Sequence, residues 1–173
     1  VGPINVTTGC APATDFSEDF ATLSNYEFPF CWTKHVYGDN SGTGTPVIEA
    51  YQYGTPHSSP MHLRFSNSNH DSAVLIAVLN QVTNLGAGTH KLSFYGKDFN
   101  ASQLVVGTMT DPSDTNTFVG HDTVTLTSIY SPYTVYFDNY SGSAEYIALR
   151  RLQTSTYRTT YIDDVVYEAI PAC

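Results

Sequence analysis

Two adjacent carboxylates, Asp163 and Asp164, interrupt an apolar and aromatic run near the end of the chain, residues 161–168. Such a run is typical of a strand in a packed sheet. An ionised carboxylate buried there costs free energy unless it is paired or binds a metal. Cations are scarce, because the chain has 7 Lys plus Arg against 16 Asp plus Glu. We therefore expect a second acidic stretch beside this one, with a hard cation between the two.

The second acidic stretch is predicted to be residues 15–20, where Glu18 stands between two phenylalanines. Calcium prefers about 6–8 oxygen ligands, and loops at the end of a sandwich can supply part of them. Magnesium suits such irregular cages less well. The alternative is that these carboxylates face solvent or accept hydrogen bonds from backbone amides. The predicted calcium ligands are Glu18, Asp39, Asn40, Asp163 and Asp164.

Catalytic motifs are absent from the sequence. It contains no G-x-S-x-G, H-E-x-x-H or P-loop pattern, and its six histidines lack the spacing of metal ligands. Paired carboxylates can act as the acid and base of a glycosidase, but none of the glutamates lies in a recognisable catalytic motif. We therefore expect a protein without enzymatic activity.

Aromatic side chains offer another kind of chemistry, because the apolar faces of sugar rings stack on them. Several of the 13 tyrosines alternate with apolar residues in predicted strands; Tyr136, for example, lies between Val135 and Phe137. Alternate residues of a strand face opposite sides, so these tyrosines should face outward. The alternative is that they only cover sheet surface, since Tyr is a favoured strand residue. The predicted ligand-binding residues, with two cationic donors among them, are Tyr95, Lys97, Tyr136, Tyr146 and Arg150.

The elements that must position these side chains are short strands separated by turns rich in Gly, Pro, Asn and Ser. Their spacing of about 8–12 residues, without a long helical period, predicts an all-β antiparallel sandwich of the jelly-roll type. Residues 1–13 are predicted to be a linker and residues 14–173 a single module. The predicted strands are residues 14–21, 30–36, 47–53, 61–65, 73–79, 90–97, 103–109, 122–127, 134–137, 145–149 and 158–170.

The charge of the chain restricts its partners. A formal net charge of -9 argues against nucleic acid and anionic membrane surfaces, which both attract basic proteins. An acidic surface suits neutral ligands and divalent cations. The sequence has no signal peptide and no long apolar span, so we expect no membrane insertion. We expect a monomeric module excised from a longer chain.

The three cysteines, Cys10, Cys31 and Cys173, contain no CxxC pair and do not form a zinc pattern. One disulfide with one free thiol, or three free thiols, are both open. If the first and last strands are neighbours, Cys10 and Cys173 lie just outside them and form the expected bridge, which would close a long loop. Cys31 is then a buried free thiol.

A set of short segments resembles the MAM-like and cleaved-adhesin-like jelly-roll modules of secreted bacterial proteins. Together the segments span residues 14–170, and the cysteines depart from the disulfide pattern of MAM domains proper. The resemblance implies a structural calcium ion, a core position for Trp32, and neighbouring modules in the same chain. The matching segments are Phe16-x-Glu18-x-Phe20, Phe28-Pro29-x-Cys31-Trp32, Gly107-Thr108-Met109-Thr110-Asp111-Pro112, Tyr146-Ile147-Ala148 and Tyr161-Ile162-Asp163-Asp164-Val165.

The function expected from these observations is non-catalytic carbohydrate binding, as an ancillary module of a secreted or surface-attached bacterial enzyme that degrades polysaccharide. A neutral polysaccharide is the expected partner because the chain is acidic. The alternative is a protein-binding adhesion module of a secreted peptidase or surface adhesin. A third alternative is a spacer without a ligand.

Overall fold

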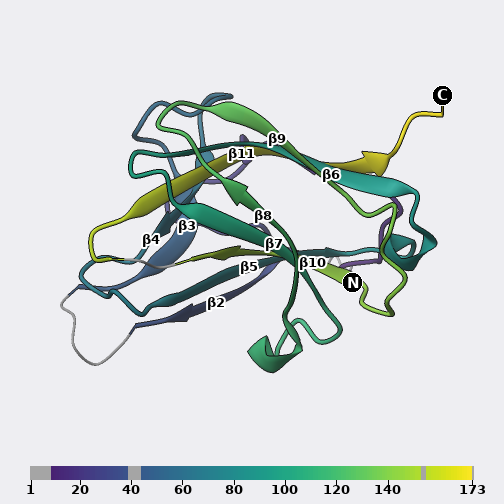
Figure 1. Ribbon diagram of the computed structural model, residues 1–173. Helices are drawn as coiled ribbons and strands as arrows, with labels where there is room; N and C mark the ends of the chain where they lie inside the picture. The colour runs from purple at the N-terminus through teal and green to yellow at the C-terminus, as the bar shows by residue number, and fades with distance from the viewer. Residues whose placement is uncertain (1–8, 39–43, 153–154, 173) are drawn as a thin grey trace, which may run out of the picture.

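The computed structural model describes residues 9–38, 44–152 and 155–172, which form a β-sandwich (Figure 1). The described residues contain eleven strands and two single-turn 3-10 helices. The strands are β1 (Phe16–Glu18), β2 (Thr33–Tyr37), β3 (Val47–Tyr51), β4 (His62–Ser66), β5 (Val74–Gln81), β6 (His90–Asp98), β7 (Gln103–Met109), β8 (Val119–Thr125), β9 (Ser131–Tyr136), β10 (Tyr146–Arg151) and β11 (Thr159–Ala169). The helices are η1 (Leu85–Ala87) and η2 (Thr115–Thr117).

The strands assemble into two antiparallel sheets. The six-stranded sheet has the order β3-β4-β11-β6-β9, with β1 added to β11, and the five-stranded sheet has the order β2-β5-β10-β7-β8. Neighbouring strands in a sheet are often far apart in sequence, so the chain crosses between the sheets repeatedly, as in a jelly roll. The predicted jelly-roll sandwich is confirmed. Within the described residues, no helix is long and apolar enough to cross a membrane.

β11 is the longest strand, and it changes partner along one of its edges. β4 pairs with residues 159–162 and β1 with residues 165–167, while β6 runs along the other edge. The pairing with β6 shifts register between Asp163 and Val166, and Asp164 has a φ of 48°. A β-bulge therefore lies at the acidic pair, where it can re-aim side chains. The expectation that the first and last strands are neighbours is confirmed.

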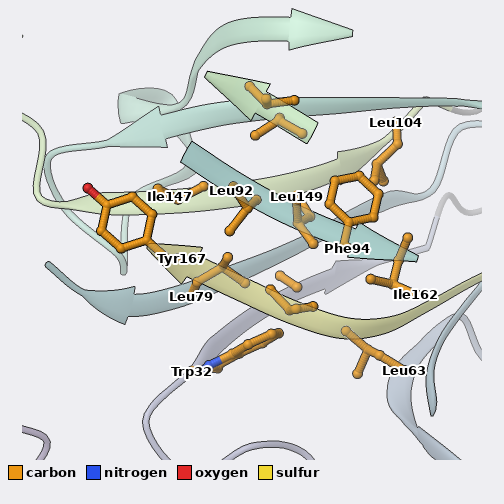
Figure 2. Packing of buried hydrophobic residues seen from close by; sticks show 14 of the residues in the cluster. Trp32, Leu63, Leu79, Leu92, Phe94, Leu104, Ile147, Leu149, Ile162 and Tyr167 are labelled. Carbon is orange, nitrogen blue, oxygen red and sulfur yellow. The ribbon is translucent and has the colours of Figure 1, made fainter. Parts of the chain in front are cut away.

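One main hydrophobic core fills the space between the sheets (Figure 2). Leu92 and Phe94 of β6 and Ile147 and Leu149 of β10 are buried, at alternate positions of strands from opposite sheets. Full burial of a side chain of this size contributes about 1.5–3 kcal/mol. Trp32 also packs in this core, as predicted.

The N-terminal segment corrects the predicted disulfide. Ala13 forms a bridge with Val82, so the chain before β1 leaves the six-stranded sheet and crosses to the end of β5. This path brings Cys10 to Cys31, and the two form a disulfide. The predictions of a Cys10–Cys173 bridge and a free Cys31 thiol are wrong for this reason. Cys173 lies outside the described residues.

Candidate functional site

The outward face of the six-stranded sheet carries charged and aromatic side chains in register. Ile48 of β3 is buried in the core, so its neighbours along the strand face outward. Residues that lie opposite each other on one face of a sheet interact directly. One row across β3, β4, β11 and β6 consists of Glu49, Arg64, Tyr161 and Lys97.

The loop between β3 and β4, residues 52–61, lies across this row. Lys97 Nζ donates hydrogen bonds to the carbonyl oxygen of Gly54 (2.5 Å) and to that of the next residue (3.0 Å). The ring of His57 stacks on the ring of Tyr95, with centroids 3.6 Å apart. Lys97 is only 6% exposed, and burial lowers its pKa. The loop therefore covers the outward side chains of Tyr95 and Lys97 and shields this part of the sheet from solvent.

The acidic pair of β11 holds this loop in place. Asp163 accepts hydrogen bonds from the backbone N–H groups of His57 (2.8 Å) and Ser58 (3.0 Å). Asp164 accepts hydrogen bonds from His57 Nδ1 (2.6 Å) and the Ser58 hydroxyl (2.7 Å). Burial raises the pKa of Asp163 to about 6; the backbone bond from Ser58 opposes this rise, and the charge of Asp164 adds to it. The two carboxylates thus act as acceptors that anchor the loop.

Glu18, which was predicted to share a cation with the acidic pair, lies on the core side of the sheet. It stands opposite Val165, which is fully buried in the core, and it accepts a hydrogen bond from the backbone N–H of Phe20 (2.7 Å). Burial raises the pKa of Glu18 even though this hydrogen bond lowers it. Asp163 points toward the outer loop instead, so the sheet separates the two carboxylates.

The described residues do not assemble the predicted calcium cage. Asp39 and Asn40 lie outside the described part of the chain. Within that part, no three Asp, Glu, His or Cys side chains cluster so that they could hold a metal ion. The calcium ion therefore stays a prediction, and metal analysis is needed to test it.

A neutral histidine lies beneath the same loop. His62 of β4 is fully buried, and a hydrogen bond joins its Nδ1 to the Tyr130 hydroxyl (2.7 Å). Burial, and then the positive charge of Lys97, lower the pKa of His62 to about 4. Burial raises the pKa of Tyr130, so both groups are neutral at pH 7. Lys97 Nζ lies 4.3 Å from the centroid of the Tyr130 ring, a cation–π contact.

Three tyrosines, Tyr26, Tyr51 and Tyr53, form a strip at the β3 edge of the same sheet, which we call the tyrosine strip. The ring centroids of Tyr26 and Tyr51 are 6.3 Å apart, and those of Tyr51 and Tyr53 are 5.4 Å apart. Tyr26 is 60% exposed and Tyr53 is 57% exposed. The guanidinium of Arg64 lies 3.7 Å from the centroid of Tyr51 and pairs with Glu49. The strip thus has two accessible rings, and its third ring, Tyr51, lies against the Arg64–Glu49 ion pair.

Tyr26 reaches the strip because the segment before β2 runs along the edge of β3. The backbone N–H of Tyr26 donates to the carbonyl of Ala50 (2.7 Å), and the N–H of Ala50 donates to the carbonyl of Glu27 (2.6 Å). Tyr26 has a φ of 76°, which is uncommon for a residue other than glycine. The segment covers an otherwise open strand edge and places Tyr26 beside Tyr51.

The predicted ligand-binding residues do not form one surface. Tyr95, Lys97 and Tyr136 lie in β6 and β9 of the six-stranded sheet, whereas Tyr146 and Arg150 lie in β10 of the five-stranded sheet. The chain crosses from one sheet to the other between β9 and β10, so consecutive strands present their outward residues on opposite sides of the sandwich. The expectation of a shared face is corrected accordingly.

The surroundings of these residues also differ. Tyr95 is covered by His57. Tyr136 is 50% exposed and stands opposite Lys91. On the other sheet, the loop that contains η2 brings Phe118 over the outward residues, and the Arg150 guanidinium lies 5.6 Å from its ring centroid. Tyr146 packs against a small apolar cluster on that side. Tyr136 is thus the most accessible of the predicted tyrosines.

Solved structures with the same fold include two cleaved adhesin domains of Lys-gingipain. The K2 cleaved adhesin domain of Lys-gingipain has a TM-score of 0.70 at 15% identity, covering 90% of this chain and 98% of that domain. The K1 domain, from Porphyromonas gingivalis, has a TM-score of 0.67 at 16% identity, covering 92% and 100%. The CBM22-1 xylan-binding domain of Paenibacillus barcinonensis Xyn10C has a TM-score of 0.55 at 12% identity, covering 94% and 99%.

The chain has the fold of cleaved-adhesin and carbohydrate-binding jelly rolls. The predicted resemblance to these modules is confirmed at the level of fold. No protein-family model matches the sequence, and the search of curated proteins finds no match either. At identities this low, the similarity shows the fold alone.

The tyrosine strip was missed by sequence reasoning. Tyr51-x-Tyr53 at the end of a predicted strand is the signal that points to it, because residues two apart share a face. No comparable signal exists for Tyr26, whose position depends on the pairing of an irregular segment with β3.

Proposed function

We propose that this chain is a non-catalytic module that binds a neutral polysaccharide through the tyrosine strip. The observation that carries the proposal is the row of three tyrosine rings, two of them more than half exposed, beside the Arg64–Glu49 pair. The fold supports the proposed class, because a xylan-binding domain shares it.

The strip has the chemistry that sugar binding needs. Tyrosine rings pack against the apolar faces of sugars, and the phenol hydroxyls remain free to form hydrogen bonds. Arg64 is held between the Tyr51 ring and Glu49, and a group that is already ordered loses less entropy on binding. We expect dissociation constants from about millimolar to micromolar, or roughly -4 to -8 kcal/mol. The net charge of -9 favours a neutral glycan over an anionic one.

The setting that we propose is a secreted or surface-attached bacterial protein in which neighbouring modules accompany this one. The Cys10–Cys31 disulfide supports this setting, because structural disulfides persist in oxidising compartments. In such a protein the module would hold a polysaccharide-degrading enzyme close to its substrate.

A second candidate function is adhesion to a protein partner, which the similarity to cleaved adhesin domains favours. Phe99 is 65% exposed and Ile129 is 71% exposed. They lie in two loops that are joined by a hydrogen bond from the Asp98 N–H to the Thr127 carbonyl (2.8 Å). Exposed apolar side chains on adjacent loops are a feature of protein-binding surfaces.

Affinity gel electrophoresis tests the carbohydrate function. The protein is run in gels that contain xylan, β-glucan, α-glucan or mannan. At least one of these neutral glycans should retard the protein, and the protein should release no soluble sugar from it. If no glycan retards it, the carbohydrate proposal fails. Surface plasmon resonance with immobilised extracellular proteins then tests adhesion, and Phe99→Ser is the variant that should lose that binding.

A further inference from the structure

A hollow of about 240 Å³ lies beside the disulfide, at the end of the five-stranded sheet. There β2 begins, β5 ends and β10 begins, and Tyr146 stands directly opposite Gln81. The side chains that give the hollow its chemistry are Phe30, Trp32, Thr33, Gln81 and Tyr146. The tyrosine strip lies on the other sheet, so the two features are separate.

The walls of this hollow are fixed before any ligand arrives. Gln81 and Tyr146 belong to paired strands, and the Cys10–Cys31 disulfide is itself part of the lining. Trp32 is buried against the main core. The carbonyl of Pro112, which also lines the hollow, accepts a hydrogen bond from His35 Nε2 (2.8 Å). Preorganised sites lose less conformational entropy on binding.

The lining combines aromatic rings with uncharged polar groups. Phe30 is 74% exposed, which is unusual for so large an apolar side chain, and it faces the same hollow as Tyr146. The Gln81 amide donates a hydrogen bond to Glu145 (2.5 Å), which leaves its carbonyl oxygen to accept from a ligand. None of the residues that line the hollow is Lys or Arg, so the hollow offers no charge to an anionic ligand.

We infer that this hollow is a second binding site, which takes a single neutral sugar residue at a chain end or side branch. The class of ligand rests on the proposed function, while the pocket itself does not. Ligand pockets for drug-sized molecules have volumes of about 300–1,000 Å³, and a volume near 240 Å³ suits one ring rather than a chain segment. The tyrosine strip, with exposed rings at both of its ends, suits the interior of a chain. The hollow would then bind a terminal or branching sugar residue, and the tyrosine strip would bind internal residues of the same glycan.

The chain provides a selective reporter for this site, because Trp32 is its only tryptophan. A nitrogen-15 correlation spectrum therefore contains one indole N–H signal from a ring at the hollow. The signal is followed in titrations with glucose, galactose, mannose, xylose and N-acetylglucosamine. At least one of these sugars should shift it saturably, with a dissociation constant on the order of 1 mM.

Variants separate this site from the tyrosine strip. Phe30→Ala and Tyr146→Ala should each raise the dissociation constant obtained from the indole titration by about fivefold to tenfold. Tyr136→Ala is the matched control, because Tyr136 is 50% exposed, lies in the other sheet and does not line the hollow. Phe30 is largely exposed, so its replacement leaves the core intact. Tyr53→Ala should weaken the retardation by polysaccharide and keep the indole shift.

Each outcome bears on one site. An indole signal that no sugar shifts at concentrations up to about 20 mM, well above a millimolar dissociation constant, overturns the second site, even where polysaccharide still retards the protein. An indole shift that survives both Phe30→Ala and Tyr146→Ala also overturns it. A saturable indole shift in a protein that polysaccharide does not retard would keep the second site and reject the tyrosine strip.

Discussion

The ring of His57 lies on the ring of Tyr95, with the two centroids 3.6 Å apart and the planes inclined by 14°. A histidine from the loop between β3 and β4 thus covers a tyrosine that the sequence assigns to sugar binding. The same histidine reaches Asp164 through its Nδ1. The loop and the acidic pair of β11 form one structural unit, and Tyr51 and Tyr53 of the tyrosine strip lie beside it, with Tyr53 the more exposed of the two rings.

His57 should therefore control the order of this loop. We expect His57→Ala to lower the free energy of unfolding by about 1–3 kcal/mol, because it removes a ring stack and a charge-assisted hydrogen bond. Ser58→Ala keeps the stack and should have a smaller effect. Hydrogen exchange followed by mass spectrometry should show that residues 52–61 exchange faster in His57→Ala than in the wild type. The exchange of β6 should stay the same in the two proteins. Unchanged exchange in the loop would mean that His57 does not anchor it.

Two buried groups, His62 and Asp163, should change the free energy of unfolding in opposite directions as the pH falls. The lowered pKa of His62, about 4 against an ordinary 6.5, gives stability that is present above pH 6.5 and lost as pH falls toward 4. The raised pKa of Asp163, about 6 against 3.8, gives stability that is present below pH 3.8 and lost as pH rises through 6. Each contribution is about 3 kcal/mol, and the two nearly cancel.

The variant His62→Gln isolates the contribution of His62, because glutamine can form a hydrogen bond with the Tyr130 hydroxyl and does not titrate. Between neutral pH and about pH 4, the variant should become more stable relative to the wild type by about 3 kcal/mol. Urea unfolding at several pH values measures this difference. Parallel pH profiles for the two proteins would show that His62 is not held neutral in the folded state.

The disulfide should contribute measurably to stability. Cys10 and Cys31 are separated by 21 residues, and the chain-entropy model assigns about 3 kcal/mol to a loop of this length. The double variant Cys10→Ser, Cys31→Ser should lose up to that amount in denaturant unfolding, while Cys173→Ser is the control. Peptide mapping without reductant should give a peptide that links residues 10 and 31. A linked peptide of residues 10 and 173 would contradict the structure described here.

The calcium prediction is tested by removing the metal. We expect one calcium ion per chain by elemental analysis and a lower melting temperature after chelation, since a ligand that binds only the folded state stabilises it. A metal-free protein with an unchanged melting curve would leave Glu18, Asp163 and Asp164 only the hydrogen bonds described above.

Much of the fold could be predicted from local patterns. The alternation of Leu92 and Phe94 with polar residues places β6, and the apolar run around Asp163 and Asp164 places β11. The turn positions follow from Gly, Pro, Asn and Ser because these residues adopt turn conformations readily. The predicted strand of residues 14–21 is shorter in the structure, where only residues 16–18 pair, because Phe20 turns the chain with a φ of 60°.

The site could not be predicted in the same way, because it is formed by contacts between residues that are distant in sequence. The alternation of apolar and polar residues within one strand gives no information on such contacts. Parity places Tyr136 and Tyr146 outward, but it does not say that their strands belong to different sheets. The disulfide depended on the bridge between Ala13 and Val82, which redirects the chain before β1. Tyr26 depended on an irregular segment that pairs with β3. In each case a contact between separate elements decided the position.

The central claim is that the tyrosine strip binds a polysaccharide, and calorimetry of matched tyrosine variants tests it most directly. The glycan that gives the strongest retardation is titrated into wild type, Tyr53→Ala and Tyr37→Ala, whose altered residues are 57% and 55% exposed. We predict that Tyr53→Ala weakens binding by about tenfold, because it removes a stacking ring, and that Tyr37→Ala binds as wild type does. Equal affinities for Tyr53→Ala and wild type, or an equal loss in both variants, would contradict the claim.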